Sequence, residues 1–166
     1  LERETVAVHE SGHGVVSWFL KGAAPLLKLT IIPRSKGALG FAQYLPNEIP
    51  LQSKEYLMNQ IVAVLAGRAA EHEFFGKVST GAYDDLQKAY RIARAIVTKL
   101  GMDGVVGQTV FVENEFGVKD YSDAQNRVID EQVHKIISEC TATAASMVKE
   151  HKEQIKHMSE QLLQKE

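Results

Sequence analysis

The sequence predicts a mainly α-helical domain with a small β-hairpin or sheet near its N-terminus. Over most of the 166 residues, apolar side chains recur at three- and four-residue steps, which place them on one face of a helix. One early stretch, 27–45, instead alternates apolar and polar residues around a turn-like centre. Because a chain of this length is large enough to bury one core, we expect a single domain over 1–166.

The first expected element is a helix over 2–20. Two histidines, His9 and His13, lie four residues apart on its repeating face, together with apolar side chains. Gly22 is the expected end of this helix, because Gly is favoured just beyond a last helical turn. Pro25 then prevents the helix from continuing.

The second expected element is a β-hairpin. Its first strand begins at Leu27, where apolar and polar residues alternate in a β-rich composition. Residues 33–40 contain Pro, Ser and two Gly, which are typical of a turn, and 41–45 form the expected second strand. A loop over 46–50 follows the hairpin, since this segment begins and ends with Pro.

Two helices are expected after that loop. Ser53 is a suitable N-cap for the first, which should extend to about Phe75 and end at Gly76. The second should cover about 82–100 and end at Gly101, with a Thr-Gly pair opening it. The expected inward face of this second helix consists of Leu86, Ala89, Tyr90, Ala93 and Val97.

The last third of the chain predicts an irregular segment followed by a helical bundle. Residues 102–121 contain three Gly and one short β-like run, 108–112. Ser122 and Gln125 have the spacing of a capping box, and helical periodicity continues to the end with one break near 149–153. The expected buried side of this stretch consists of Val133, Ile136, Ile137, Cys140, Ala144 and Met147.

Composition excludes several classes of function. The net charge is −2 and no run of Lys or Arg forms a basic patch, so no nucleic-acid partner is expected. The single cysteine, Cys140, allows no internal disulfide and is expected to be a buried structural thiol. No apolar run approaches the ~20 residues of a membrane span. Because the chain starts at Leu1, within a helical pattern, we expect a fragment of a longer protein.

His9, Glu10 and His13 form an H-E-x-x-H motif within the first expected helix. One helical turn separates the two histidines, so both imidazoles project from the same face and are spaced to bind one Zn²⁺. Glu10 points about 100° further round the helix, where a carboxylate can take a proton from water beside the metal. The pattern predicts a zincin-type active helix followed by a helical bundle. Without a metal, burying two histidines and a glutamate together would be costly.

The third ligand of the expected zinc site is not determined by spacing alone. A catalytic zinc usually has three protein ligands, and no further His follows His13 at the spacing of extended motifs. Four acids are candidates, while the other histidines lack companions at ligand spacing or lie among charged residues typical of a surface. Acids in a first helical turn also complement the helix dipole, which is our preferred explanation for Asp84. The candidate acids are Glu71, Glu73, Asp84 and Asp85, and the other histidines are His72, His134, His151 and His157.

Three ordered motifs resemble the peptidase domain of the FtsH family of AAA proteases. They are H-E-S-G-H at 9–13, A-G-R-A-A-E at 66–71 and S-T-G-A-Y-D-D-L at 79–86. The segment 31–46 is most similar to the mitochondrial, paraplegin-like members, the m-AAA protease subunits. The resemblance covers essentially the whole chain, and three motifs in order are far more specific than H-E-x-x-H alone.

The resemblance implies a complete ligand set. The family's third ligand is the aspartate just before the aliphatic residue of T-G-A-x-x-D-[LI], which in this sequence is Asp85. Zn²⁺ would then be bound by His9, His13 and Asp85, with Glu10 as the catalytic base. Glu71 would be a helper beside the site.

Two residues depart from the family pattern without removing a ligand. Ala66 replaces the first Gly of Gly-Gly-Arg, which keeps a small side chain for close helix packing. Gly14 replaces an Ala after the second histidine, and Gly within a helix costs up to ~1 kcal/mol relative to Ala. Neither departure argues for an inactive enzyme.

The resemblance also implies the setting of the reaction. We expect a zinc metalloendopeptidase that hydrolyses unfolded or membrane-extracted polypeptides within a homo- or hetero-hexameric AAA protease for protein quality control. ATP would be used by an upstream domain, since the one Gly-Lys pair here, Gly76-Lys77, is followed by Val78 and forms no phosphate-binding loop. The implied location is the matrix face of the mitochondrial inner membrane, with membrane contact only through upstream segments.

The sequence also suggests a site for the substrate, and two alternative functions remain to be tested. The strand over 41–45 offers an edge to which an extended substrate can add through backbone hydrogen bonds. The first alternative is a non-catalytic zinc-binding assembly module of the same ring, although a structural site has no use for Glu10 as a base. The second is a zinc hydrolase acting on a small molecule, which the three-motif match disfavours.

Overall fold

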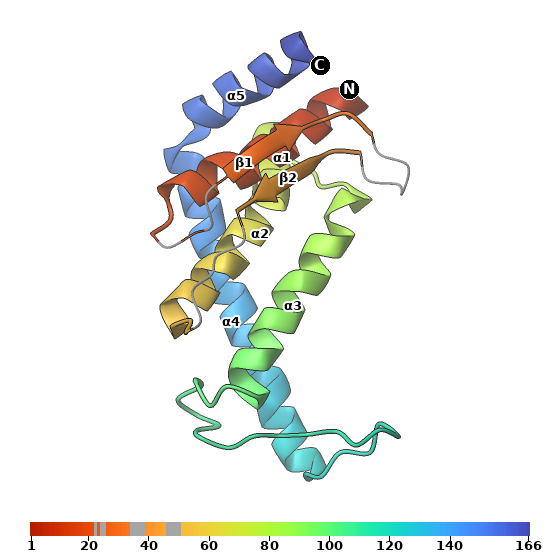
Figure 1. Cartoon of the computed structure of the whole chain (residues 1–166), viewed down its shortest axis with the longest axis vertical. Helices are drawn as coiled ribbons and strands as arrows, with labels where there is room; N and C mark the ends of the chain where they lie inside the picture. Colours follow the sequence, from red (N-terminus) through yellow and green to blue (C-terminus); the bar gives the residue numbers. More distant parts are fainter. Residues whose placement is uncertain (22, 24–25, 34–38, 46–50) are drawn as a thin grey trace.

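The computed structural model confirms a mainly α-helical fold with a two-stranded antiparallel sheet near the N-terminus (Figure 1). It describes residues 1–21, 23, 26–33, 39–45 and 51–166. The expected helix end at Gly22, the block at Pro25 and the loop over 46–50 lie outside the described residues, as does most of the hairpin turn. The elements are α1 (Glu2–Phe19), β1 (Leu26–Thr30), β2 (Phe41–Tyr44), α2 (Lys54–Phe75), η1 (Thr80–Ala82), α3 (Tyr83–Thr98), α4 (Asp123–Glu150) and α5 (Lys152–Lys165).

Helix α2 is the centre of the fold, because α1, α3 and α4 all pack against it. The approach of α1 to α2 depends on small residues. A Cβ atom added at Gly12 would lie 2.7 Å from Cβ of Ala70 and 2.8 Å from the carbonyl oxygen of Ala66. Real Cβ atoms do not approach other atoms this closely, so Gly12 allows the two backbones to meet. This contact brings the histidine face of α1 against α2.

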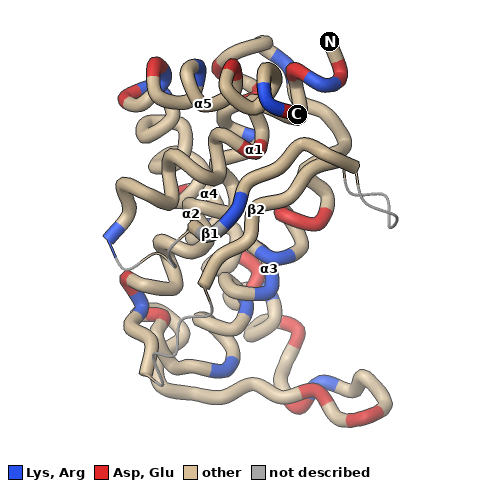
Figure 2. The backbone as a smooth tube through the Cα atoms, turned by 45° about the horizontal axis from the view of Figure 1, so that its top comes forward, with Lys and Arg blue, Asp and Glu red and all other residues tan. Residues whose placement is uncertain are grey.

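The hairpin lies across α1, with β2 as the strand on the side of α3 (Figures 1 and 2). Thr30 pairs with Phe41 and Leu26 pairs with Tyr44, and a register irregularity separates Leu26 from Lys28. Just beyond β1, the Ile31 N–H donates a hydrogen bond to Glu166 Oε2 at 2.7 Å. The end of α5 therefore lies at the outer edge of the hairpin beside β1.

The expected helix boundaries are largely confirmed. Ser53 and Ser122 accept hydrogen bonds from the backbone N–H groups three residues later, so both serines cap the helices that follow them. Gly76 ends α2 with a φ of 67°, a backbone conformation that Gly adopts at little cost. The break in the C-terminal helical stretch falls at His151, between α4 and α5.

Two expectations for the middle of the chain are wrong. Leu86 and Tyr90 of α3 are 41% and 47% exposed. The buried stripe of α3 instead continues through Ile96, because α3 packs mainly on α2 and α4. The run 108–112 forms no strand, since its backbone pairs with the end of α3, where the Phe111 N–H donates to the Thr98 carbonyl.

The remaining core assignments mostly hold. Cys140 is buried on α4 as expected, and burial raises the pKa of its thiol to about 11, which does not suit a nucleophile. His151, expected to be an exposed surface histidine, instead stacks on Phe19 with the ring centroids 3.8 Å apart. No helix in the described part of the chain is both long and apolar enough to cross a membrane.

Candidate metal centre

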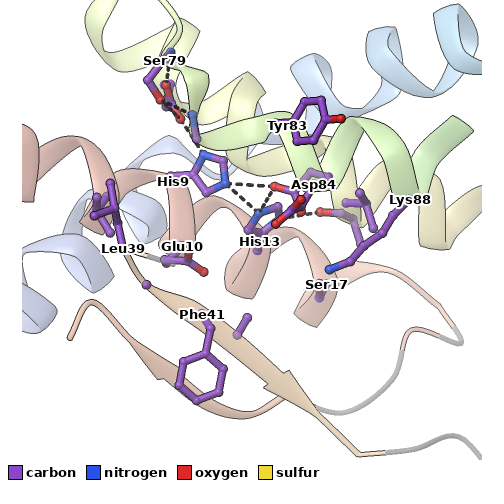
Figure 3. Close-up of a pocket in the computed structure, with 18 of the residues that line it drawn as sticks. His9, Glu10, His13, Ser17, Leu39, Phe41, Ser79, Tyr83, Asp84 and Lys88 are labelled. Carbon is purple, nitrogen blue, oxygen red and sulfur yellow. Dashed lines mark hydrogen bonds and ion pairs between the residues drawn. The ribbon is translucent and has the colours of Figure 1, made fainter. Parts of the chain in front are cut away.

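Three side chains from two separate helices converge on one point. The Nε2 atoms of His9 and His13 lie 3.0 Å apart, and Asp85 Oδ2 lies 3.1 Å from the first and 3.0 Å from the second. The structure thus brings together the three residues that the resemblance assigned as ligands, from α1 and from the first turn of α3 (Figure 3). In the described residues, this is the one group of three with metal-binding spacing.

The other nitrogen of each histidine ring is held by a group that only accepts hydrogen bonds. His13 Nδ1 lies 2.9 Å from the backbone carbonyl oxygen of Ala63, and His9 Nδ1 lies 2.6 Å from Glu71 Oε1. Neither a carbonyl nor a carboxylate can donate, so both Nδ1 atoms must carry the proton. When both rings are neutral, the lone pairs of the two Nε2 atoms and the Asp85 Oδ2 atom are therefore directed toward one common point. Such a cluster of electron-rich atoms is stable only around a proton or a cation.

The pKa values follow from this arrangement. Burial alone would lower the pKa of His9, but hydrogen bonds to Asp85 and Glu71 and the nearby charge of Glu10 raise it to about 9. Burial would likewise raise the pKa of Asp85, yet hydrogen bonds from His13 and His9 hold it well below its usual range. Without a metal, a proton on His9 is therefore what neutralises the cluster.

Glu10 lies beside the cluster without being one of its three members. Its side chain is buried on α1, and burial raises the pKa of the carboxyl above its ordinary value of 4.5, against the opposing effect of His13 and His9. Gly40 packs against it from the hairpin side, where an added Cβ would lie 3.0 Å from Glu10 Cγ. A raised pKa suits a carboxylate that must take up and release a proton near neutral pH.

A cavity of about 970 Å³ opens over the converging atoms. Its walls come from α1, α2, α3 and the strand β2, and Glu10 and Asp85 both line it (Figure 3). Phe41 and Ala42 of β2 also line it, and Figure 3 shows Phe41 on the hairpin side, across from His9 and His13. The cavity therefore borders both the hairpin and the two histidines.

The remaining sequence candidates lie away from the three converging atoms. Asp84 is exposed and lines the cavity without joining the cluster, while Glu73 faces Lys152 at 3.4 Å. Glu71 is only 1% exposed and contacts His9 from behind, so its carboxylate orients that ring. The histidines outside the motif take no part in the cluster: His72, His134, His151 and His157.

Sequence reasoning missed one residue of the site, Gly67. A Cβ atom there would lie 2.6 Å from Nε2 of both His9 and His13. Any side chain at this position would therefore displace the two rings. The signal was present in the A-G-R motif, whose small residues indicated close packing, but only the fold shows that the space is needed for the histidines.

A buried helix that presents H-E-x-x-H toward an acid from a neighbouring helix defines the class of H-E-x-x-H metallopeptidases. Comparison with protein families matches residues 1–166 to Peptidase family M41, and the chain belongs to that family.

Individual relatives agree with the family assignment. The chain is 46% identical over 168 residues to the "ATP-dependent zinc metalloprotease FTSH 10, mitochondrial" of Arabidopsis thaliana, covering 100% of this chain and 20% of that protein. It is 43% identical over 169 residues to the mouse "Mitochondrial inner membrane m-AAA protease component AFG3L2", covering 99% and 21%. It is 42% identical over 171 residues to "ATP-dependent zinc metalloprotease FtsH" of Rhodothermus marinus, covering 99% and 24%. The predicted resemblance is confirmed, and the chain spans a fifth to a quarter of these relatives.

Proposed function

We propose that this chain is the zinc-dependent peptidase part of an ATP-dependent protease and that His9, His13 and Asp85 bind its zinc ion. The observation that supports this most directly is the convergence of two Nε2 lone pairs and one carboxylate oxygen on one point. Ligand atoms at ~2.0–2.1 Å from a tetrahedral zinc are ~3.3 Å apart, so the separations of 3.0–3.1 Å need only a small expansion. The donor set and its spacing therefore fit Zn²⁺.

Glu10 is the proposed general base. When bound, zinc polarises the scissile carbonyl and makes the attacking water more acidic. Glu10 accepts the proton of that water and later delivers it to the leaving amine. The role needs a carboxylate next to the metal but not bound to it. It is supported by Glu10 lining the cavity without belonging to the group of His9, His13 and Asp85.

Substrate is proposed to add as a further strand along β2. The β1 side of the hairpin is the side where Ile31 contacts Glu166, whereas β2 lines the cavity. Backbone pairing along β2 would hold an extended chain beside the cluster with little dependence on its side chains. Such broad binding suits an enzyme that degrades many unfolded polypeptides.

Replacing Ala42 or Gln43 of β2 with Pro tests this binding mode. Pro has no N–H, so it removes one backbone donor, and in an antiparallel strand only alternate N–H groups face outward. We expect one of the two variants to lower the rate of peptide cleavage by about 10-fold, roughly 1.4 kcal/mol, while zinc content stays at the wild-type level. Ala42→Gly, which keeps the N–H, is the control. Unchanged cleavage in both proline variants would exclude the strand-addition mode.

Zinc binding at pH 7 is expected to release about one proton per ion, because the ligand must be neutral imidazole and the pKa of His9 is raised to about 9. Since this pKa exceeds the ordinary 6.5, His9 protonation stabilises the metal-free fold below pH 6.5. That contribution is lost as the pH rises through about 9. Titration calorimetry in buffers of different ionisation enthalpy measures the released proton. A binding heat that does not depend on the buffer would contradict a protonated His9.

The wider setting is proposed from the relatives alone. Their names describe ATP-dependent, zinc-dependent and mitochondrial inner-membrane proteases, and one is called a component of an m-AAA protease. By that likeness, we propose a hexamer of related subunits on the matrix side of the inner membrane. An ATPase domain elsewhere in the protein would deliver unfolded polypeptides to the cavity, and membrane contact would come from segments beyond this chain.

The proposed function is tested by measuring metal content beside cleavage of an unfolded protein. We expect about one zinc per chain, cleavage that stops when a chelator removes the metal, and recovery when zinc is restored. Zinc retained without any cleavage would favour the assembly-module alternative. Absence of zinc binding would refute the metal centre itself.

A further inference from the structure

Ser79 lies in a hydrogen-bonded connection between His9 of α1 and the segment that leads into α3, which carries Asp85. It lies between α2 and η1, and three hydrogen bonds meet on it. The Ser79 N–H donates to Glu71 Oε2 at 2.7 Å, and the Ser79 hydroxyl donates to Glu71 Oε1 at 3.1 Å. The hydroxyl oxygen in turn accepts from the Gly81 N–H at 3.2 Å. In Figure 3, the His9 ring lies between Ser79 on one side and His13 on the other.

The direction of these hydrogen bonds is fixed by chemistry. A carboxylate only accepts and a backbone N–H only donates, so the hydroxyl between them has one orientation. Glu71 Oε1 also accepts from His9 Nδ1 at 2.6 Å. One continuous chain of hydrogen bonds therefore runs from the Gly81 N–H through Ser79 and Glu71 to the ring of His9.

The two ends of this chain belong to the two sides of the metal centre. Gly81 lies in η1, which leads directly into α3 and so to Asp85 four residues later. His9 lies on α1. Glu71 is 1% exposed, and a carboxylate buried this deeply is stable only when its oxygens accept hydrogen bonds. Within the described residues, two of its three donors come from Ser79, so Ser79 determines the position of the carboxylate.

We propose that Ser79 is a positioning residue that holds the first and third zinc ligands in register, by fixing Glu71 against His9 and the start of η1 against Glu71. The inference rests on the zinc centre of the proposed function. Without the hydroxyl, the backbone bond to Glu71 remains, but the link to Gly81 and one contact on Oε1 are lost. His9 and Asp85 then move more independently, and zinc leaves faster.

The test is the rate at which the zinc-loaded chain loses its metal to a chelating dye. Ser79→Ala is expected to increase this rate by about 10-fold, the lower end of the effect of losing an outer-sphere partner. Ser79→Thr keeps a hydroxyl and should restore a rate near that of the wild type. Ser122→Ala is the matched control, because Ser122 also caps a helix through its hydroxyl, at 3.1 Å from the Gln125 nitrogen. It lies at the start of α4, at the end of the molecule away from α1 (Figure 1).

A double-mutant cycle separates positioning from general loosening. In a Glu71→Gln background, Ser79→Ala should change the rate less than about twofold, because both substitutions interrupt the same chain of hydrogen bonds. Wild-type rates in Ser79→Ala, equal acceleration in Ser122→Ala, or additive effects with Glu71→Gln would each overturn the proposal. If the wild-type chain holds zinc and the Ser79→Ala variant loses zinc at the same rate, only the inference about Ser79 fails. A wild-type chain that binds no zinc refutes the proposed function as well.

Discussion

Replacing Glu10 with Gln is expected to reduce peptide hydrolysis by about 10²- to 10⁴-fold, the range that general-base catalysis supplies. Gln has nearly the same shape as Glu but cannot accept a proton at neutral pH. Glu10 is buried beside the cluster, and burial raises its pKa toward the range in which a base both takes up and releases a proton. Because Glu10 is not one of the three converging residues, the zinc content of the variant should stay at the wild-type level.

The experiment compares cleavage of an unfolded protein with zinc content and melting temperature in the same preparations. Glu4→Gln is the matched control, since Glu4 lies exposed on the same helix and undergoes the same change of charge. We expect this control to behave like the wild type in all three measurements. Full activity in Glu10→Gln would exclude Glu10 as the base, and loss of zinc would show that its carboxylate binds the metal.

Local sequence patterns were sufficient to predict the helix faces and helix ends, because these depend on residues that are neighbours in the chain. The i, i+4 spacing of His9 and His13 fixes their common face in any α-helix, whatever packs against it. Ser53 and Gly76 bound α2 for equally local reasons, because each satisfies backbone groups at one helix end. The fold class followed from many such local preferences pointing in the same direction.

Residues whose role depends on distant parts of the chain were not determined in this way. Spacing left four acids as open candidates for the third ligand, and only a family resemblance chose among Glu71, Glu73, Asp84 and Asp85. The choice depends on where α3 is placed relative to α1 in the folded chain, which helical periodicity does not reveal. The same limit explains the error at Leu86, since an apolar residue on a helix does not reveal which face finds a partner.

Gly67 illustrates the limit at atomic scale. Its place in the sequence suggests only a small residue within a helix, where Gly is unfavourable by ~1 kcal/mol relative to Ala. In the structure, an added Cβ would lie 2.6 Å from both Nε2 atoms, so the space beside α2 belongs to the two imidazoles. The unfavourable Gly is thus explained by the two histidine rings beside it rather than by the helix that contains it.

The second large effect is expected from Asp85→Ala, which should weaken zinc retention by more than the ~10- to 100-fold that loss of an outer-sphere partner costs. Asp85 Oδ2 lies within 3.1 Å of both histidine Nε2 atoms, and its removal leaves two imidazoles without the charge that balances the cation. In the metal-free chain, the same change removes the hydrogen bond that contributes most to raising the pKa of His9. Zinc affinity from competition with a chelator of known strength provides the measurement.

Asp84→Ala tests whether the third ligand is Asp85 or the neighbouring Asp84. Asp84 and Asp85 both lie in the first turn of α3, so both substitutions remove one charge from the same helix N-terminus and cost similar helix-dipole stabilisation. Their side chains differ in what they reach, because successive residues on a helix point ~100° apart. Asp84 is exposed at the cavity, whereas Asp85 faces the histidines. Zinc affinity near the wild-type level in Asp84→Ala, with loss in Asp85→Ala, is the expected outcome, and the reverse result would transfer the ligand role to Asp84.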